Sequence, residues 1–411
     1  MTHSPGPCGV PGASTRPRYE VAQIIRDHSG QLRAESLSAE QRQVLAALAA
    51  CRTAALGGHV QQCAGCGHRQ PQYNSCRNRH CPKCQALAQH RWLDERKSRI
   101  LPVHYFHVVF TLPAELRPLV LRNRRRLYDL LFEAASRSLL ELGLDPDRLG
   151  ALLGITAVLH TWTRDLSFHP HLHCVVTGGG LRFDSDQWVK TRPGYLFPVQ
   201  VLAQLFRGKF LHGLRALYDA GLLDLGGACQ PLSHPEAMQG LLDGLYRKRW
   251  VVYSKPPFGG ADAVYAYLGR YTHRVGISNA RLLHVDATSV RFRTRHQRQA
   301  TLSPVEFLRR LMLHVLPKGF VRIRHFGLLS PASVPTRLQR SRELLDAETG
   351  SRQTTTPPRL AQKPSASTDA DVPAYVLHYL RLTGVDLRQC PACGQHKVCF
   401  LPLERTAQGP P

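Results

Sequence analysis

Two histidines separated by one apolar residue, His171 and His173, are the side chains in this sequence whose spacing best suits chemistry. They lie in the stretch 168–176, where apolar residues alternate with them as in a half-buried strand. On a strand, the two imidazoles project from one face, roughly 7 Å apart along the chain. Neutral imidazole is the commonest side-chain ligand of divalent metals. The spacing therefore predicts a metal site on this strand.

A third metal ligand is expected close to the two histidines. Asp165 lies a few residues before them and could supply a carboxylate, so we choose it as the third ligand. His169 falls on the same strand face as His171 and His173, and it could be a reserve ligand or an outer hydrogen-bond donor. Because the chain contains 21 histidines, a chance pattern with a structural role is the alternative.

Two tyrosines four residues apart, Tyr267 and Tyr271, are the second candidate for chemistry. Asp262 can cap a helix that begins just before them, and at about 3.6 residues per turn the two phenols share one helix face. The alternative is a role in packing, because Val264, Leu268 and Tyr271 also form an apolar stripe. Residues suited to phosphate oxygens accompany the tyrosines: Arg270, His273 and Arg274.

The histidines and tyrosines together suit chemistry on a phosphodiester. A metal ion held by the imidazoles can bind the non-bridging phosphate oxygens and offset the charge that builds up during attack. Attack by a phenol gives a phosphotyrosine ester, from which a later 3′-hydroxyl can displace the phenoxide without ATP. Because one phenol can hold the first 5′ end while the other cuts a second site, the pattern predicts strand transfer and not simple hydrolysis.

Two Cys-x2-Cys pairs have the spacing of a zinc site. Cys63 and Cys66 are followed, after fourteen residues, by Cys81 and Cys84. Two such pairs can close a tetrahedral thiolate site with zinc–sulfur distances of about 2.3 Å, so we predict one zinc ion held by these four cysteines. Neighbouring residues allow a second site or the replacement of one cysteine by histidine: Cys76, His80, His59 and His68.

The stretch around these cysteines is strongly basic. Arg77, Arg79 and Lys83 lie within it, and a basic zinc-binding module of this kind suits DNA binding. Alternatively, a run of charged residues can simply form a solvent-exposed face without any binding role. If Cys76 and His80 bind no zinc, Cys76 would be a small buried residue and His80 a phosphate contact.

Another group of metal-binding residues lies near the C-terminus. Cys390, Cys393, His396 and Cys399 follow one another at intervals of three residues. From this spacing alone we predict that the compact group can hold zinc by itself, although the intervals are tight for four ligands of one ion.

The composition indicates a polyanionic partner. The 411 residues include 54 Lys and Arg against 29 Asp and Glu, which gives a formal net charge of +25. Such an excess is typical of nucleic-acid-binding proteins. The sequence has neither a run of about 18 apolar residues nor a secretory signal pattern, so we exclude a membrane protein and expect nucleic acid in the cytoplasm. Most of the 12 cysteines lie in Cys-x2-Cys groups, which indicates metal binding and not disulfides.

The order of apolar segments predicts an α+β fold with a largely antiparallel central sheet, flanked by helices and preceded by a zinc-binding module. Gly178, Gly179 and Gly180 predict a tight turn after the histidine strand, so that hairpins follow it. Ser38 and Gln41 have the spacing of a capping box at the start of an N-terminal helix. Further strands are predicted at 104–111, 155–162, 250–253, 281–284 and 289–294, and helices at 119–142, 199–248 and 304–316.

We expect the tyrosine helix to pack with its phenols facing the metal held by the central histidine strand.

Composition also divides the chain into segments. The predicted segments are a flexible tail at 1–18, a zinc-binding DNA-recognition domain at 19–100, a catalytic domain at 101–335, a disordered linker at 336–373 and a C-terminal tail with a zinc knuckle at 374–411.

Seven segments resemble, in the same order, those of the HUH (His-hydrophobic-His) rolling-circle transposases of the insertion-sequence-ninety-one type, which carry an amino-terminal zinc-binding module. Together they span about residues 45–330. The matching segments are 73–85, 105–113, 159–162, 169–180, 255–260, 267–279 and 314–320.

The resemblance implies an HUH endonuclease domain and a transposase that cleaves and rejoins single-stranded DNA through a covalent 5′-phosphotyrosine intermediate. Its partners would be the single-stranded ends of the element and the target DNA, in the bacterial cytoplasm and with the nucleoid. Two alternatives stay open. A plasmid-type replication initiator or relaxase would use the same chemistry, and a zinc-dependent DNA-binding protein would use the histidines and tyrosines structurally.

The resemblance also implies roles for single residues. His171 and His173 would bind Mg²⁺ or Mn²⁺, and Tyr267 and Tyr271 would be the nucleophiles. The third metal ligand stays open among three residues: Asp165, which we carry over, His169 and His160.

Overall fold

The structure is a computed structural model of the chain. It describes residues 17–33, 37–84, 89, 92–93, 95–96, 99–258, 276–295, 297–348, 376–377, 379–380 and 384–403. The tyrosine helix predicted from the sequence lies outside the described residues, and so do its five site residues: Tyr267, Arg270, Tyr271, His273 and Arg274.

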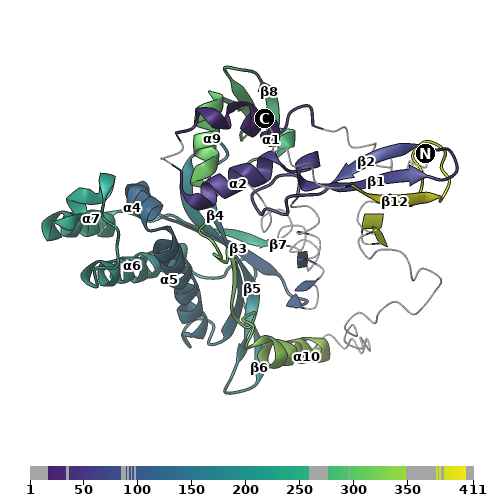
Figure 1. Cartoon of the computed structure of the whole chain (residues 1–411). Coiled ribbons are helices and arrows are strands. Elements are labelled where there is room, and N and C mark those ends of the chain that lie inside the picture. The colour runs from purple at the N-terminus through teal and green to yellow at the C-terminus, as the bar shows by residue number, and fades with distance from the viewer. Residues whose placement is uncertain are drawn as a thin grey trace, which may run out of the picture.

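A six-stranded sheet forms the centre of the structure (Figure 1). Its strand order is β11-β4-β5-β3-β7, and β6 pairs with β5 beside this path. All these pairings are antiparallel, which confirms the predicted α+β fold with a central histidine strand. The strands are β3 (Tyr105–Thr111), β4 (Leu152–Trp162), β5 (Phe168–Arg182), β6 (Gln187–Lys190), β7 (Val252–Phe258) and β11 (Ile323–Gly327).

The side chains of β5 alternate between the two faces of this sheet. Leu172, Cys174 and Val176 are buried in the main hydrophobic core, so His171 and His173 project from the opposite face. Helices cover the core face; for example, Phe110 of β3 and Phe206 of α6 have ring centroids 5.0 Å apart. The helices of this layer are α4 (Arg117–Arg122), α5 (Arg124–Leu144), α6 (Val199–Asp219) and α7 (Pro235–Arg247).

A second hydrophobic core joins N-terminal residues with residues between 277 and 315. The N-terminal helices α1 (Val21–His28) and α2 (Ala39–Ala49) pack against α9 (Pro304–Leu313) (Figure 1). The predicted capping box is present, because Ser38 and Gln41 each accept a hydrogen bond from the other's backbone amide. The boundary predicted at residue 100 therefore does not separate two cores. A small antiparallel sheet completes this region: β8 (Leu282–Val285), β9 (Val290–Arg293) and β10 (Gln299–Leu302).

A third sheet extends away from the rest of the structure (Figure 1). Its central strand β1 (Gly58–Cys63) pairs with β2 (Arg69–Tyr73) on one side and with β12 (Val398–Leu403) on the other, both antiparallel. The C-terminal strand therefore returns to the zinc-binding segment that lies more than three hundred residues earlier in the chain.

The three consecutive glycines form no tight turn, contrary to our prediction. Gly178, Gly179 and Gly180 lie inside β5, which continues to Arg182. A Cβ atom at Gly179 would lie 2.6 Å from the carbonyl oxygen of Val189, and one at Gly180 would lie 2.6 Å from that of Leu152. Glycine is needed here because neighbouring strands approach closely, and not for its freedom in a turn.

The predicted linker begins later than expected. Its first part forms a π-helical turn, Val334–Leu338, and helix α10 (Gln339–Glu348). Leu338 and Leu345 are buried in a small core with Leu101 and Leu152, which explains why this polar stretch is ordered. Residues 349–375 lie outside the described residues.

The remaining helical segments are short. The stretch predicted as one helix at 199–248 is divided by a 3₁₀ segment, Gly227–Ser233, between α6 and α7. Other 3₁₀ turns are Ser29–Gln31, Ala54–Leu56, Ala114–Leu116 and Asn279–Arg281.

Among the helices that the structure describes, none combines the length and the apolar character needed to cross a lipid bilayer.

The close approach at Gly179 can be tested by adding one methyl group. Gly179→Ala should lower the free energy of unfolding by about 1–3 kcal/mol, because the Cβ would meet the Val189 oxygen and the Trp188 ring 2.8 Å away. Gly208→Ala in α6 is the matched control, since nothing lies within 4 Å of its Cβ and alanine favours helix. Urea unfolding measures both, and an unchanged midpoint for Gly179→Ala would contradict the packing.

Candidate metal centres

Three histidine rings from two adjacent strands meet on the sheet face opposite the main core. His160 of β4 lies directly across from His171 of β5 in the antiparallel register. Directly opposed residues share a face, and His173 lies two positions further along β5 on that same face. One ligand nitrogen of each ring lies within 4.8 Å of those of the other two. The structure therefore brings the two predicted ligands together with His160.

Hydrogen bonds determine which ring nitrogens can face a ligand. Nδ1 of His171 lies 2.7 Å from the carbonyl oxygen of His169, so Nδ1–H donates and Nε2 keeps its lone pair. Nδ1 of His173 lies 2.8 Å from Nε2 of His107 on β3, and the two rings are stacked. When His173 is the donor of this bond, its Nε2 carries the lone pair that a metal ion needs.

Burial keeps two of these imidazoles uncharged. Removal from water lowers the pKa of His171 to about 4 and that of His107 to about 4. Both rings are therefore neutral near pH 7, which is the form in which histidine binds a metal ion. The cluster offers one imidazole nitrogen from each of its three histidines.

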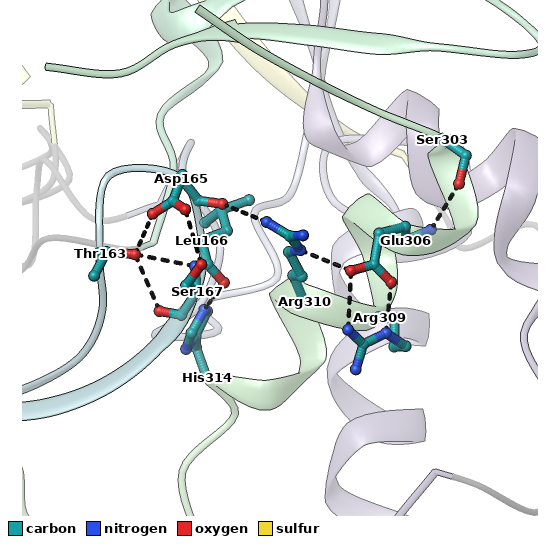
Figure 2. Close-up of polar contacts among 9 residues, drawn as sticks. All are labelled: Thr163, Asp165, Leu166, Ser167, Ser303, Glu306, Arg309, Arg310 and His314. Carbon is teal, nitrogen blue, oxygen red and sulfur yellow. Dashed lines mark hydrogen bonds and ion pairs between the residues drawn. The ribbon is translucent and has the colours of Figure 1, made fainter. Parts of the chain in front are cut away.

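Asp165, which we predicted as the third ligand, is engaged elsewhere (Figure 2). Its carboxylate accepts hydrogen bonds from the hydroxyl groups of Thr163 and Ser167, the second at 2.8 Å. Burial opposes its ionisation, but these two hydroxyls lower the pKa of Asp165 overall. The carboxylate thus closes the turn between β4 and β5, whereas His160, one of the alternatives that the sequence left open, lies in the three-histidine group. His169, the other alternative, also lies outside the three-histidine group.

Helix α9 holds this turn in place (Figure 2). Arg310 donates to the carbonyl oxygen of Asp165 at 3.2 Å. His314, just after α9, donates from Nε2 to the carbonyl oxygen of Leu166 at 3.1 Å, so its Nδ1 accepts from the Thr161 hydroxyl at 3.2 Å. Leu166 has a φ of +64°, a conformation that L-residues rarely adopt and that these contacts stabilise.

The four cysteines that we predicted to bind one zinc ion belong to two separate clusters. In the first, Cys81 and Cys84 meet Cys51 and Cys76, with all sulfurs within 4.8 Å of one another. The Cys51–Cys84 distance is 3.5 Å and the Cys76–Cys84 distance is 3.7 Å. The thiols of Cys76 and Cys81 lower the pKa of Cys51 to about 7, which favours the thiolate form that binds zinc. Cys51 is not part of a Cys-x2-Cys pair, so we did not assign it to a metal site from the sequence.

The second cluster joins cysteines from both ends of the chain. Cys63 and Cys66 meet Cys390 and Cys393, again with all sulfurs within 4.8 Å of one another. Cys63 is the last residue of β1 and Cys66 follows it, whereas Cys390 and Cys393 precede β12, which pairs with β1. Spacing alone could not predict this grouping, because 323 residues lie between Cys66 and Cys390.

The compact C-terminal group that we predicted is consequently divided. Cys399 lies on β12, where its sulfur is 3.3 Å from the carbonyl oxygen of Gln62. Nδ1 of His396 lies 3.6 Å from the carboxylate of Asp386. Neither residue belongs to the cluster of Cys390 and Cys393.

Two of the three basic residues predicted to contact DNA bind the protein itself. Arg79 donates to the carbonyl oxygens of Phe320 at 2.6 Å and Pro317 at 3.1 Å. Lys83 forms an ion pair with Glu20 at 2.6 Å. These two side chains attach the zinc-binding segment to other parts of the fold.

The other residues of this stretch differ in their exposure. Arg77 is exposed, and its contact with DNA stays a prediction. His80, which we considered as a zinc ligand, lies outside the cysteine clusters, and burial lowers its pKa to about 3. Cys76 does belong to a cluster.

Fold and sites define an α+β protein with two thiolate clusters and a separate histidine cluster. A family profile described as "Transposase zinc-binding domain" matches residues 24–112, and one described as "Putative transposase" matches residues 154–337. The chain belongs to the family of zinc-binding insertion-sequence transposases of the insertion-sequence-ninety-one type. Zinc is therefore a cofactor and DNA is the partner of this class of enzyme.

Two relatives agree with this assignment. The "Putative transposase y4qJ" of Sinorhizobium fredii is 44% identical over 400 residues, which cover 95% of this chain and 97% of the relative. The "Transposase for insertion sequence element IS801" of Pseudomonas savastanoi pv. phaseolicola is 32% identical over 293 residues, which cover 68% of each chain. No solved structure gives a significant match.

The buried His314 makes a prediction about pH. Burial lowers its pKa to about 4 in the folded chain, whereas an unfolded histidine titrates near about 6.5. The unfolded state therefore binds its proton first, and this residue should cost about 2 kcal/mol of stability between pH 7.5 and pH 5. His314→Gln should show a smaller loss over that range, although it is less stable at pH 7.5.

Urea unfolding at both pH values measures this difference. His212→Gln, which changes an exposed residue of α6, is the matched control and should keep the wild-type dependence on pH. Identical dependence in the wild type and His314→Gln would contradict the buried neutral imidazole.

Proposed function

We propose that this transposase cleaves and rejoins single-stranded DNA through a covalent 5′-phosphotyrosine intermediate, and so drives rolling-circle-type transposition of an insertion sequence. The observation that carries this proposal is the cluster of His160, His171 and His173 on two paired strands. It has the composition of a metal site, and the phosphate chemistry needs one. We place the reaction in the bacterial cytoplasm, at the nucleoid where the DNA substrate lies.

The three imidazoles fit a divalent cation, Mn²⁺ or Mg²⁺. Imidazole nitrogen suits transition metals, whereas Mg²⁺ prefers oxygen ligands, so Mn²⁺ should be the more effective ion. When bound, the cation offsets negative charge on the non-bridging oxygens of the scissile phosphate. His107 positions the metal-binding ring of His173 through their 2.8 Å hydrogen bond.

Positive side chains near the histidine cluster support binding of a phosphate. Lys255 of β7 and Arg295, which follows β9, are both exposed. Their charges add to the effect of burial in lowering the pKa of His107 and His171, respectively, so both lie close enough to influence the cluster. A DNA phosphate at the cluster would therefore meet cationic groups from two different parts of the fold.

Tyr267 and Tyr271 are the proposed nucleophiles. The phenolic oxygen of one attacks the phosphorus atom and loses its proton, the bond between phosphorus and the 3′ oxygen breaks, and the leaving 3′ oxygen takes up a proton. The 5′ end then stays on the enzyme as a phosphotyrosine ester. A second 3′-hydroxyl later attacks that phosphorus and releases the phenol, so the number of ester bonds is conserved and no ATP is consumed.

The tyrosine pair can be tested with a covalent adduct assay. Incubation with Mn²⁺ and single-stranded oligonucleotides that carry the ends of the element should give a protein–DNA band that survives denaturation. Tyr267→Phe together with Tyr271→Phe should remove the band, because the phenyl group has no oxygen to attack with. Tyr246→Phe, an exposed tyrosine of α7, is the control and should keep it. An adduct that persists in the double variant would refute the proposed nucleophiles.

The third ligand can be tested by comparing His160 with Asp165. His160→Ala should weaken Mn²⁺ binding by about 100-fold or more and reduce adduct formation, because one nitrogen of the donor set is lost. Asp165→Asn should bind Mn²⁺ almost as the wild type does, and should instead lower the unfolding temperature through the weakened turn. Calorimetric titration with Mn²⁺ of zinc-loaded protein distinguishes the two. The reverse pattern would restore Asp165 as the ligand.

A further inference from the structure

The four sulfurs of the second cysteine cluster are arranged as in a tetrahedral thiolate site. The Cys63–Cys393 and Cys66–Cys390 distances are both 3.7 Å, and all four sulfurs lie within 4.8 Å of one another. Zinc–sulfur bonds of about 2.3 Å place the corners of a tetrahedron roughly 3.8 Å apart. Disulfide sulfurs would be about 2 Å apart, so these cysteines are spaced for a shared ion and not for covalent pairing.

The two halves of this cluster have the same local structure. Each is a Cys-x2-Cys-Gly turn, in which the glycine amide, Gly67 or Gly394, donates to the carbonyl oxygen of the first cysteine at 2.9 Å. Both glycines have a positive φ, +71° and +73°. The first cysteine's own amide donates, also at 2.9 Å, to the carbonyl oxygen five residues on, at His68 in one turn and Gln395 in the other. This equivalence shows two matched knuckles that face each other.

Other contacts bring the two knuckles together. Strand β12 pairs with β1 over six residues, from Gly58 opposite Leu403 to Cys63 opposite Val398. Beyond the strands, the amide of Ala64 donates to the carbonyl oxygen of Lys397 at 2.9 Å. A Cβ atom at Gly65 would lie 2.2 Å from Oε1 of Gln395, so the first turn lies directly against this side chain of the second turn.

We propose that Cys63, Cys66, Cys390 and Cys393 bind a zinc ion, which holds the C-terminal segment to the N-terminal zinc-binding module. This ion is separate from the one bound by the first cluster, all of whose cysteines lie between residues 51 and 84. The matched family profile for the zinc-binding domain ends at residue 112, so it contains only half of the proposed site. The other half comes from the C-terminal segment.

This site connects metal binding to the folding of the chain end. A knuckle with two cysteines holds zinc weakly, and a second knuckle supplies the other two bonds only if β12 reaches β1. Part of the free energy of zinc binding then offsets the entropy cost of closing the long loop between Cys66 and Cys390. Without the ion, strand β12 would no longer be held against β1.

The zinc content of the purified full chain tests the proposal. Cys390→Ser with Cys393→Ser should lower the zinc content by one ion per chain relative to the wild type, as measured by mass spectrometry of the metal after dialysis. Cys63→Ser with Cys66→Ser should lose the same single ion, and the four substitutions combined should lose no more than either pair. Cys399→Ser is the matched control, because it changes a cysteine of the same segment that lies outside the cluster, and it should lose none.

Two outcomes of this measurement would overturn the proposal. One is wild-type zinc content in Cys390→Ser with Cys393→Ser. The other is a loss of one ion from each pair that adds to two ions in the combined variant, since each knuckle would then bind its own ion. Circular dichroism of each variant establishes that the remaining fold is intact.

A cleavage experiment tests the attachment of the C-terminal segment independently. A specific protease site is inserted between residues 352 and 356, in the part of the chain between α10 and the second knuckle. After cleavage of the zinc-loaded protein, the C-terminal fragment should co-elute with the remainder on size exclusion. In Cys390→Ser with Cys393→Ser it should separate, whereas in Cys399→Ser it should stay. A fragment that stays bound in the double variant would refute attachment through zinc.

Discussion

The pairing of β4 with β5 is the interaction on which the histidine cluster depends. In this register His160 lies across from His171, and all three imidazoles project from one face. A slip by one residue would send His160 into the hydrophobic core on the other side of the sheet. The turn between the strands sets the register, because the amide of Thr163 donates to the carbonyl oxygen of Ser167 at 3.0 Å and the Asp165 carboxylate binds both hydroxyls. The Asp165 carboxylate thus stabilises the turn that aligns the two histidine-bearing strands.

How much of the site the sequence could predict depends on distance along the chain. His171 and His173 were predictable, because a strand's alternation is a local property. His160 was one of three candidates for the third ligand, and the sequence could not choose among them, because the place of His160 is determined by strand pairing. The cysteine clusters show the same limit: Cys-x2-Cys spacing identified knuckles correctly, but the partner of each knuckle is chosen by the fold. Cys51, which is not part of such a pair, gave no local signal at all.

Prediction of the fold also depended on whether a feature is determined by residues close together in the sequence. Antiparallel strands, the flanking helices and the Ser38 capping box were predictable from apolar periodicity and turn residues. Gly179 was misread, because a glycine needed for close packing of a neighbouring ring looks in the sequence like a glycine needed for a turn. The sequence placed Arg79 among the DNA contacts and gave no sign of its contacts within the protein, for a related reason. Its hydrogen bonds to two backbone carbonyls come from a segment more than two hundred residues away.

The second hydrophobic core has a mechanical consequence. Gln41 of α2 donates to the carbonyl oxygen of Met312 at 2.8 Å, and α9, to which Met312 belongs, holds the turn before β5 through Arg310. The N-terminal helices and the histidine-bearing strands are therefore parts of one stiff frame. A shift of the N-terminal helices would therefore be passed through α9 to the turn that precedes the histidine strand.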